Sequence, residues 1–118
     1  MSKKILIVDD DQDLLIAYRS ILETKGHDVT TCSTSNAGLK AFNDNKPDIV
    51  FLDMIVDKAN AGIEMCEKIR ETDKNVKIYL LSDVGEATTS NLNIHDLGFN
   101  GALQKPVKPN ELLTLVAK

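Results

Sequence analysis

Acidic side chains gather directly after the first apolar segment of the chain. Residues 5–8, ILIV, run straight into Asp9, Asp10 and Asp11. Two carboxylates about 4 Å apart repel each other by about 4 kcal/mol at an effective dielectric constant of about 20. Such a cluster at the end of a buried strand therefore needs a compensating partner, which can be solvent, a helix N-terminus or a cation.

Polar residues follow three other apolar segments in the same way. Asp53, Ser82 and Lys105 each stand at or near the end of a short run of apolar residues. Taken alone, each has a structural explanation, because Asp and Ser start turns or cap helices and a Lys can lie in solvent. In a parallel sheet, however, the carboxyl ends of the strands meet at one edge, where ligands bind. We therefore expect these residues to converge there with Asp9 and Asp10.

The charges expected at that edge predict a divalent cation. Asp9, Asp10 and Asp53 carry three negative charges and Lys105 carries one positive charge, so two negative charges remain. Oxygen ligands without His or Cys favour Mg²⁺, which binds to one or two carboxylates and keeps several waters. A phosphoryl oxygen can replace one of these waters, and Ser82 and Lys105 can bind the same phosphoryl group.

Alternating apolar segments predict the fold that positions these residues. The five expected strands are 5–8, 28–32, 48–52, 76–81 and 101–103. Three of them are almost continuous in Ile, Val and Leu, as in strands that are buried on both faces. Helical periods are expected over 14–22, around 37–42 and 63–69, within 86–97 and from Pro109 onward. Five strands that alternate with five helices predict one α/β domain, doubly wound around a parallel sheet.

Composition excludes several classes of function. The 118 residues carry a net charge of −4, no Trp and 4% aromatic residues, which argues against direct binding to nucleic acid or to an anionic membrane. Cys32 and Cys66 are too few and too far apart for a disulfide framework, and no apolar run is long enough to span a membrane. The apolar start is too short for a signal peptide, so we expect a cytoplasmic protein.

The residues at the expected edge also carry a family resemblance. Four segments, IVDDDQDLL, DIVFLDMIV, IYLLSDVG and GALQKPVKPNELL, resemble in order and spacing the receiver domain of two-component response regulators. The resemblance covers residues 1–118 and implies a flavodoxin-like (βα)5 fold with strand order 2-1-3-4-5. It also implies Mg²⁺-dependent phosphotransfer from a phosphohistidine to an aspartate, with autodephosphorylation but no turnover of an external substrate.

The resemblance implies a role for each residue of the expected site. Asp53 corresponds to the phosphoacceptor, Ser82 to the switch hydroxyl and Lys105 to the cation that pairs with the phosphoryl group. The implied Mg²⁺ ligands are Asp9, Asp10, Asp53 and the backbone carbonyl of Ile55. Relatives often have a cis peptide bond before the residue that corresponds to Pro106.

The resemblance further implies partners for the domain. The phosphodonor would be a sensor histidine kinase or a histidine phosphotransfer protein. The output would be an effector domain or a second copy of the domain, reached through the face formed by the fourth helix, the fifth strand and the fifth helix. The chain is then either a stand-alone receiver or a receiver excised from a longer regulator.

Three positions depart from the family pattern. Asp57 stands where Pro is usual, Asp83 stands where a small residue is common, and Ala102 stands where an aromatic switch residue is usual. None of the three is a site residue, so we expect them to affect the output more than the phosphorylation. The alternative is a pseudo-receiver, which binds partners without being phosphorylated. Such domains usually lack an acid, the hydroxyl or the lysine, whereas this chain has all of them.

Overall fold

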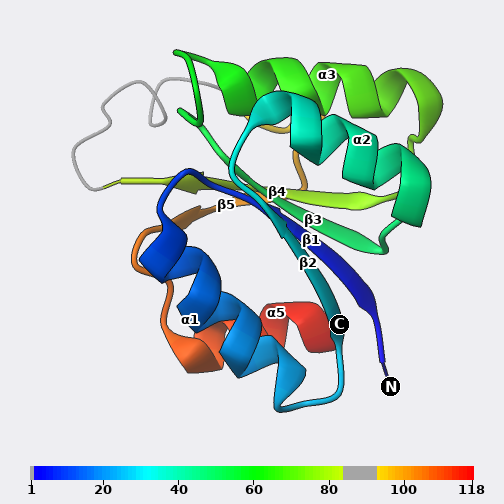
Figure 1. Cartoon of the computed structure of the whole chain (residues 1–118). Coiled ribbons are helices and arrows are strands. Elements are labelled where there is room, and N and C mark those ends of the chain that lie inside the picture. Colours follow the sequence, from blue (N-terminus) through cyan, green and yellow to red (C-terminus); the bar gives the residue numbers. More distant parts are fainter. Residues whose placement is uncertain (1, 84–92) are drawn as a thin grey trace.

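A five-stranded parallel sheet forms the middle layer of the computed structural model, which describes residues 2–83 and 93–118 (Figure 1). The strands are β1 (Lys4–Val8), β2 (Asp28–Cys32), β3 (Ile49–Asp53), β4 (Lys77–Ser82) and β5 (Gly101–Gln104). They are paired in the order β2-β1-β3-β4-β5, and all four pairings are parallel. The predicted strand order and the flavodoxin-like fold are therefore confirmed.

Helices cover both faces of this sheet (Figure 1). The helices α2 (Ser35–Asn45) and α3 (Ala61–Thr72) lie on one face, and α1 (Gln12–Glu23) and α5 (Pro109–Ala117) lie on the other. The side chains of β1 alternate between these layers: Leu6 belongs to the core beneath α2 and α3, whereas Ile5 belongs to the core beneath α1 and α5. All five residues of β3 are buried, as expected for a central strand of a doubly covered sheet.

Short polar residues determine where the first two helices begin. The side chain of Asp11 accepts a hydrogen bond from the backbone N–H of Leu14 and caps α1, and Thr34 caps α2 by accepting from Ala37. Asp11 therefore caps α1, so the helix N-terminus is the partner of this member of the acidic run. After α1 the chain turns at Gly26, whose φ of 85° is readily adopted by glycine.

The described part of the segment before β5 is a turn. We predicted a helix within 86–97, of which residues 86–92 lie outside the described residues; residues 94–98 form the turn. Arg70 of α3 fixes the end of this turn, because its guanidinium donates to the carbonyl of Gly98 at 2.9 Å and to Oδ1 of Asn100 at 3.0 Å. Phe99 is buried in the core, as predicted, and Ala102 is exposed. The proposed output face is thus described only in its β5 and α5 parts.

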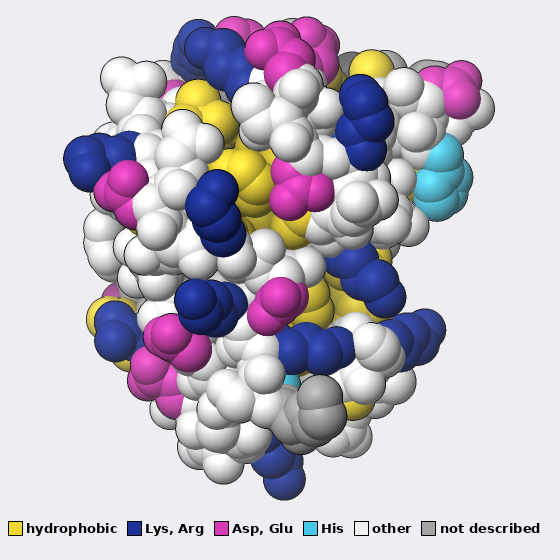
Figure 2. Space-filling model, turned by 90° about the vertical axis from the view of Figure 1, so that its right-hand side faces the viewer, with side chains coloured by type: hydrophobic (Ala, Val, Ile, Leu, Met, Phe, Trp, Pro, Cys, Tyr) yellow, Lys and Arg dark blue, Asp and Glu magenta, His cyan; other side chains and the backbone are white. Residues whose placement is uncertain are grey.

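Lysine side chains gather at the end of the molecule where the strands begin. Figure 2 shows that end, where Lys and Arg side chains surround hydrophobic ones and are interspersed with acidic ones. Lysines that open a strand or closely follow a helix are Lys4, Lys25, Lys46, Lys74 and Lys77. Positive charge near helix C-termini is favourable, and Lys3 donates to the carbonyl of Val116 in the last turn of α5 at 2.6 Å. Among the described residues, no helix combines the length and apolar character that crossing a membrane requires.

Gly62 allows the start of α3 to lie directly against the end of β3. Its backbone N–H donates to the carbonyl of Met54 at 3.0 Å. A Cβ at this position would collide with the carbonyl oxygen of Asp53 and would lie 3.1 Å from the Cα of Met54. Because these are backbone atoms, no side-chain rotation can relieve the contact. Gly62 therefore determines the path by which the chain leaves Asp53.

We expect Gly62→Ala to lower the free energy of unfolding by about 1–3 kcal/mol, the usual cost of overpacking. This loss opposes the gain of about 1 kcal/mol that Ala brings in an exposed helix interior. Urea unfolding measures the change. The control is Glu67→Ala, which introduces the same residue at an exposed position of α3 and should change stability by less than about 0.5 kcal/mol. A Gly62→Ala variant as stable as the wild type would contradict the close approach.

Candidate functional site

Three carboxylates meet at the carboxyl edge of the sheet. Asp9 directly follows β1, Asp53 is the last residue of the adjacent β3, and Asp10 begins the loop to α1. One carboxylate oxygen from each of the three lies within 4.8 Å of the other two. Asp9 and Asp53 are buried, whereas Asp10 is exposed. The cluster therefore combines two desolvated charges with one that faces water.

The ammonium group of Lys105 lies between the two buried acids. Its Nζ is 3.2 Å from Oδ2 of Asp9 and 3.2 Å from Oδ1 of Asp53. It is also 3.8 Å from Oδ1 of Asp83, whose side chain is 65% exposed. Asp83, which we did not count among the site residues, therefore lies next to one of them. This pair is exposed at the Asp83 end, so water screens it more than the two buried pairs.

Ser82 lies at the same edge as these charges. It is the last residue of β4, is buried, and pairs with Gln104 in the register of β5. The carbonyl of Ser82 accepts a hydrogen bond from the backbone N–H of Lys105 at 2.7 Å. The peptide bond between Lys105 and Pro106 is cis, as the resemblance implied. The structure thus brings together all the side chains that the sequence predicted for the site, and their roles stay predictions.

The pKa values of the buried groups reflect one excess negative charge. Burial and the neighbouring charge of Asp9 raise the pKa of Asp53 from 3.8 to about 7, although Lys105 acts in the opposite direction. Burial alone would lower the pKa of Lys105, but the charges of Asp53 and Asp9 raise it well above its usual value. Lys105 therefore stays protonated, and two buried acids share its single charge. A further cation would relieve the remaining repulsion, so the donor set fits a metal ion with oxygen ligands.

Asp57 ties the loop after β3 to the start of α2. Its carboxylate accepts hydrogen bonds from the backbone N–H of Ser35 at 3.0 Å and from Oγ of Ser35 at 2.7 Å. These hydrogen bonds lower the pKa of Asp57. The residue that replaces the usual Pro thus holds the loop by hydrogen bonds to a helix N-terminus. Ile55 lies in the same loop, and the residue is 50% exposed.

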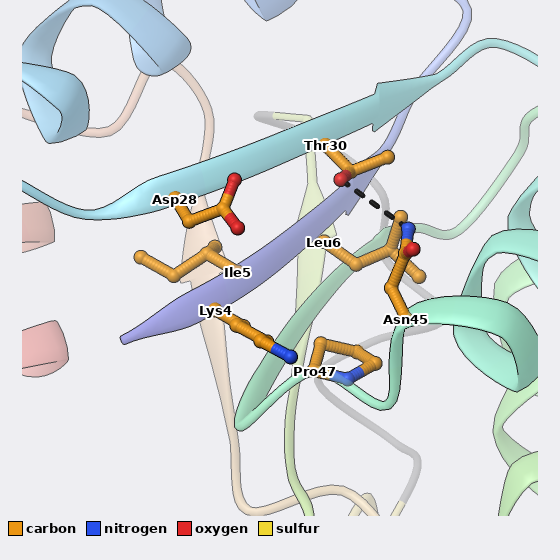
Figure 3. A pocket seen from close by; sticks show the side chains of 7 residues that line it. All are labelled: Lys4, Ile5, Leu6, Asp28, Thr30, Asn45 and Pro47. Atoms are coloured by element: carbon orange, nitrogen blue, oxygen red, sulfur yellow. Dashed lines mark hydrogen bonds between the residues drawn. The ribbon is translucent and has the colours of Figure 1, made fainter. Parts of the chain in front are cut away.

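A cavity of about 180 Å³ lies far from this site, at the end where β1 and β2 begin (Figure 3). Its lining residues are Lys4, Ile5, Leu6, Asp28, Thr30, Asn45 and Pro47. Asn45 reaches across to Thr30, and its Nδ2 lies 3.5 Å from Oγ1 of Thr30. None of the predicted site residues contributes to this cavity.

A polar contact of Tyr18 near the site was not predicted from the sequence. Tyr18 lies within the helical period expected over 14–22, which accounts only for its apolar ring, yet its hydroxyl accepts a hydrogen bond from the backbone N–H of Val107 at 2.7 Å. The available signal was the residue type, because a buried Tyr usually finds a hydrogen-bond partner. The identity of that partner, 89 residues away, could not be read from the sequence.

Comparison with known proteins agrees with this geometry. The family model described as the response regulator receiver domain matches residues 5–117. The chain belongs to this family. Alkaline phosphatase synthesis transcriptional regulatory protein PhoP of Bacillus subtilis (strain 168) is 34% identical over 112 residues, which are 95% of this chain and 46% of PhoP. A receiver domain protein (CheY-like) from Methanospirillum hungatei JF-1 superposes with a TM-score of 0.88 at 26% identity, over 99% of this chain and 92% of that one.

A second relative shows the same coverage. DNA-binding response regulator MtrA of Mycobacterium tuberculosis (strain ATCC 25618 / H37Rv) is 31% identical over 116 residues, which are 98% of this chain and 50% of MtrA. This receiver domain thus spans about half the length of the curated relatives it matches. Its family is one of phosphorylation-based signalling domains in two-component systems.

The pKa of Asp53 predicts how stability without divalent cations depends on pH. Because the pKa is raised from 3.8 to about 7, the folded domain holds this proton more tightly than the unfolded chain. Protonation of Asp53 favours the folded state at low pH, and this contribution is lost as the pH rises through about 7. Asp53→Asn removes the charge and leaves Lys105 paired with Asp9. We expect this variant to unfold at higher urea concentration than the wild type at pH 8, by a margin that shrinks towards pH 5.

The matched control is Asp13→Asn, an exposed acid in the first turn of α1. It should gain no stability at either pH, because a carboxylate there is favourable to the helix. Equal unfolding midpoints for the wild type and Asp53→Asn at pH 8 would show that the negative charge of Asp53 does not destabilise the folded domain.

Proposed function

We propose that this receiver domain accepts a phosphoryl group on Asp53, in a Mg²⁺-dependent transfer from a phosphohistidine. The observation that carries the proposal is the buried carboxylate of Asp53, 3.2 Å from a buried ammonium and beside a second buried acid. A buried carboxylate with a raised pKa and a specific charged partner is typical of a reactive group. The family to which the chain belongs supports the same reaction.

The transfer is a displacement at phosphorus. A carboxylate oxygen of Asp53 attacks the phosphorus atom, and the new O–P bond replaces the P–N bond of phosphohistidine. The electron pair of the broken bond stays on the imidazole nitrogen, and a ring protonated at its other nitrogen leaves as neutral imidazole. The protein supplies mainly position and charge, since little other covalent chemistry is needed. The product is an aspartyl phosphate.

Lys105 and Ser82 are the residues that would bind the transferred group. Lys105 already lies against Asp53, and the charge that the phosphoryl group brings makes it a stronger partner for the ammonium than a carboxylate. Ser82 ends the strand next to Asp53 and can donate its hydroxyl to a phosphoryl oxygen. A pull on Ser82 would move the end of β4, which is how we expect the modification to reach the output surface.

The acidic cluster would hold the metal ion. We assign Asp9, Asp10, Asp53 and the backbone carbonyl of Ile55 as the groups that bind it. Bound Mg²⁺ would supply positive charge that offsets the charge on the phosphoryl group. Asp10 is the exposed member of the cluster, so it leaves part of the site open to water and to the phosphodonor.

The partners follow from the reaction and from the relatives. The phosphodonor would be a sensor histidine kinase or a histidine phosphotransfer protein, and the transfer would take place in the cytoplasm. MtrA is named a DNA-binding response regulator, which supports an effector domain in a longer protein. Ala102, exposed on β5, replaces the bulky residue that fills the space left by the switch hydroxyl in relatives. We therefore expect the output to depend on backbone movement at the end of β4.

Phosphorylation of Asp53 is tested with a small phosphodonor. Incubation of the wild type with acetyl phosphate and Mg²⁺ should give a base-labile adduct of one phosphoryl group, detected by intact-protein mass spectrometry. Asp53→Asn should give no adduct, because the amide cannot attack phosphorus. Asp57→Asn, an acid in the same loop, should be labelled like the wild type. An adduct on Asp53→Asn would identify another acceptor, and an unmodified wild type would favour the pseudo-receiver.

Metal binding is tested separately with Asp10→Asn. We expect the dissociation constant for Mg²⁺ to rise by about tenfold or more, which corresponds to about 1.4 kcal/mol. The stability without metal should rise, because one like charge leaves the cluster. Both quantities are obtained from thermal unfolding across a Mg²⁺ titration. Asp11→Asn is the matched control, since Asn can also cap α1 and Asp11 lies outside the cluster. An unchanged titration for Asp10→Asn would remove this residue from the metal site.

A further inference from the structure

A buried hydrogen bond joins α1 to the loop between β5 and α5. The backbone N–H of Val107 donates to the hydroxyl oxygen of Tyr18 at 2.7 Å. Both residues are buried, at 4% exposure each, in the core between the sheet and the α1 and α5 layer. A hydrogen bond of this length in a desolvated place is costly to break, because the donor would be left without a partner.

This bond restrains the same short loop that carries Lys105. The backbone N–H of Lys105 is held by the carbonyl of Ser82 at 2.7 Å, at the end of β4. Two residues further on, Val107 is held by Tyr18. Pro106, between them, has no N–H to donate. The backbone on either side of the Lys105 side chain is therefore anchored to two different elements, one in the sheet and one in α1.

From these contacts we propose that Tyr18 is a positioning residue that holds Lys105 in the geometry needed for phosphotransfer. The inference rests on the proposed function and adds a residue to it. Lys105 must keep its ammonium within 3.2 Å of both Asp9 and Asp53 while most of its side chain is shielded from water. A long, flexible lysine side chain meets that demand only if its backbone is fixed. Tyr18 supplies the anchor from the helix layer.

The chemistry of the tyrosine side chain explains why this residue type suits the position. The ring packs among apolar side chains, as Leu15 and Leu22 do on the same face of α1. Its hydroxyl places an oxygen at the far end of that apolar body, where the N–H of Val107 needs an acceptor. Phe would preserve the packing and lose only the acceptor. Tyr18→Phe is therefore a test of the hydrogen bond alone.

The chain offers a matched control for this substitution. Tyr79 on β4 is the other of its two tyrosines, and it belongs to the same buried cluster. Its ring stacks on Phe51 with centroids 5.7 Å apart. Among the described residues, the hydroxyl of Tyr79 makes no hydrogen bond to the loop of Lys105, so Tyr79→Phe removes a tyrosine hydroxyl and leaves both backbone anchors of that loop in place. The two variants thus separate the loss of a tyrosine hydroxyl in general from the loss of the bond to Val107.

The experiment measures a rate and a spectroscopic signature for the two variants and the wild type. The rate is that of phosphorylation by phosphoramidate at saturating Mg²⁺. Urea unfolding first establishes that every variant is folded at the temperature of the assay. The signature is the ¹⁵N resonance of the Lys105 ammonium group without metal, assigned by its absence in Lys105→Ala. A buried ammonium between two carboxylates exchanges its protons slowly with water, so this resonance reports its position.

We expect Tyr18→Phe to slow phosphorylation by about threefold to tenfold, the range expected for one lost buried hydrogen bond. Its Lys105 resonance should shift and exchange faster with water. Tyr79→Phe should match the wild type in both measurements. A wild-type rate for Tyr18→Phe would overturn the inference. A slower rate with an unchanged Lys105 resonance would overturn it too, because Tyr18 would then act by another route.

Failure of the proposed function gives a different pattern. If the wild type is not phosphorylated under any condition, the assignment of Asp53 fails whatever Tyr18 does. A shifted Lys105 resonance in Tyr18→Phe would still show that the hydroxyl holds the lysine, but the residue would then have no part in phosphotransfer, and the inference would fall with the proposed function. If the wild type is phosphorylated and Tyr18→Phe is phosphorylated at the same rate, the proposed function stands and only the inference about Tyr18 fails.

Discussion

The shared charge of Lys105 is the interaction on which the carboxyl edge of the sheet depends. One buried ammonium lies 3.2 Å from each of two buried carboxylates, Asp9 and Asp53. Among the described residues, removing the lysine would leave both acids without a positively charged partner, and breaking a buried ion pair in this way costs about 3–5 kcal/mol. Replacing one acid by a neutral residue should instead stabilise the fold, because one carboxylate and one ammonium remain as a balanced pair. With both acids present, negative charge exceeds the single positive charge of Lys105. This excess makes the edge suitable for a cation and helps to raise the pKa of Asp53.

The register of the sheet, more than the loops, brings these groups together. Val8 lies opposite Leu52, so Asp9 and Asp53 emerge side by side from β1 and β3. Ser82, the last residue of β4, pairs with Gln104 of β5. Lys105 directly follows Gln104 and therefore lies at the same edge of the sheet. A slip of one residue in any pairing would turn a site side chain to the other face of the sheet. The continuous burial of the central strands therefore fixes the site as well as the core.

The sequence allowed much of the fold and the site to be predicted, because both depend on local signals. Buried strands require runs of Ile, Val and Leu. Polar residues that follow such runs in a parallel sheet lie together at its carboxyl edge. The contacts that escaped prediction join residues far apart in the chain. Tyr18 reaches Val107 across 89 residues, and Asp57 reaches Ser35 across 22 residues. Nothing in the local pattern of either segment determines its partner, since only the packed layers bring them together.

The departures at Asp83 and Ala102 differ in what they can affect. Asp83 is 3.8 Å from Lys105 but 65% exposed, and exposed ion pairs typically contribute less than about 1 kcal/mol. The two buried carboxylates therefore dominate the position of the ammonium, and Asp83 can adjust it only slightly. Ala102 has a different consequence, because its methyl group on the exposed side of β5 is too small to fill space beneath β4 if the proposed movement of Ser82 opens it. Asp83 thus adds little to the charges at the carboxyl edge, where the two buried acids still outnumber Lys105, whereas a path from Ser82 to the surface, as in our proposal, would run through the backbone of β4.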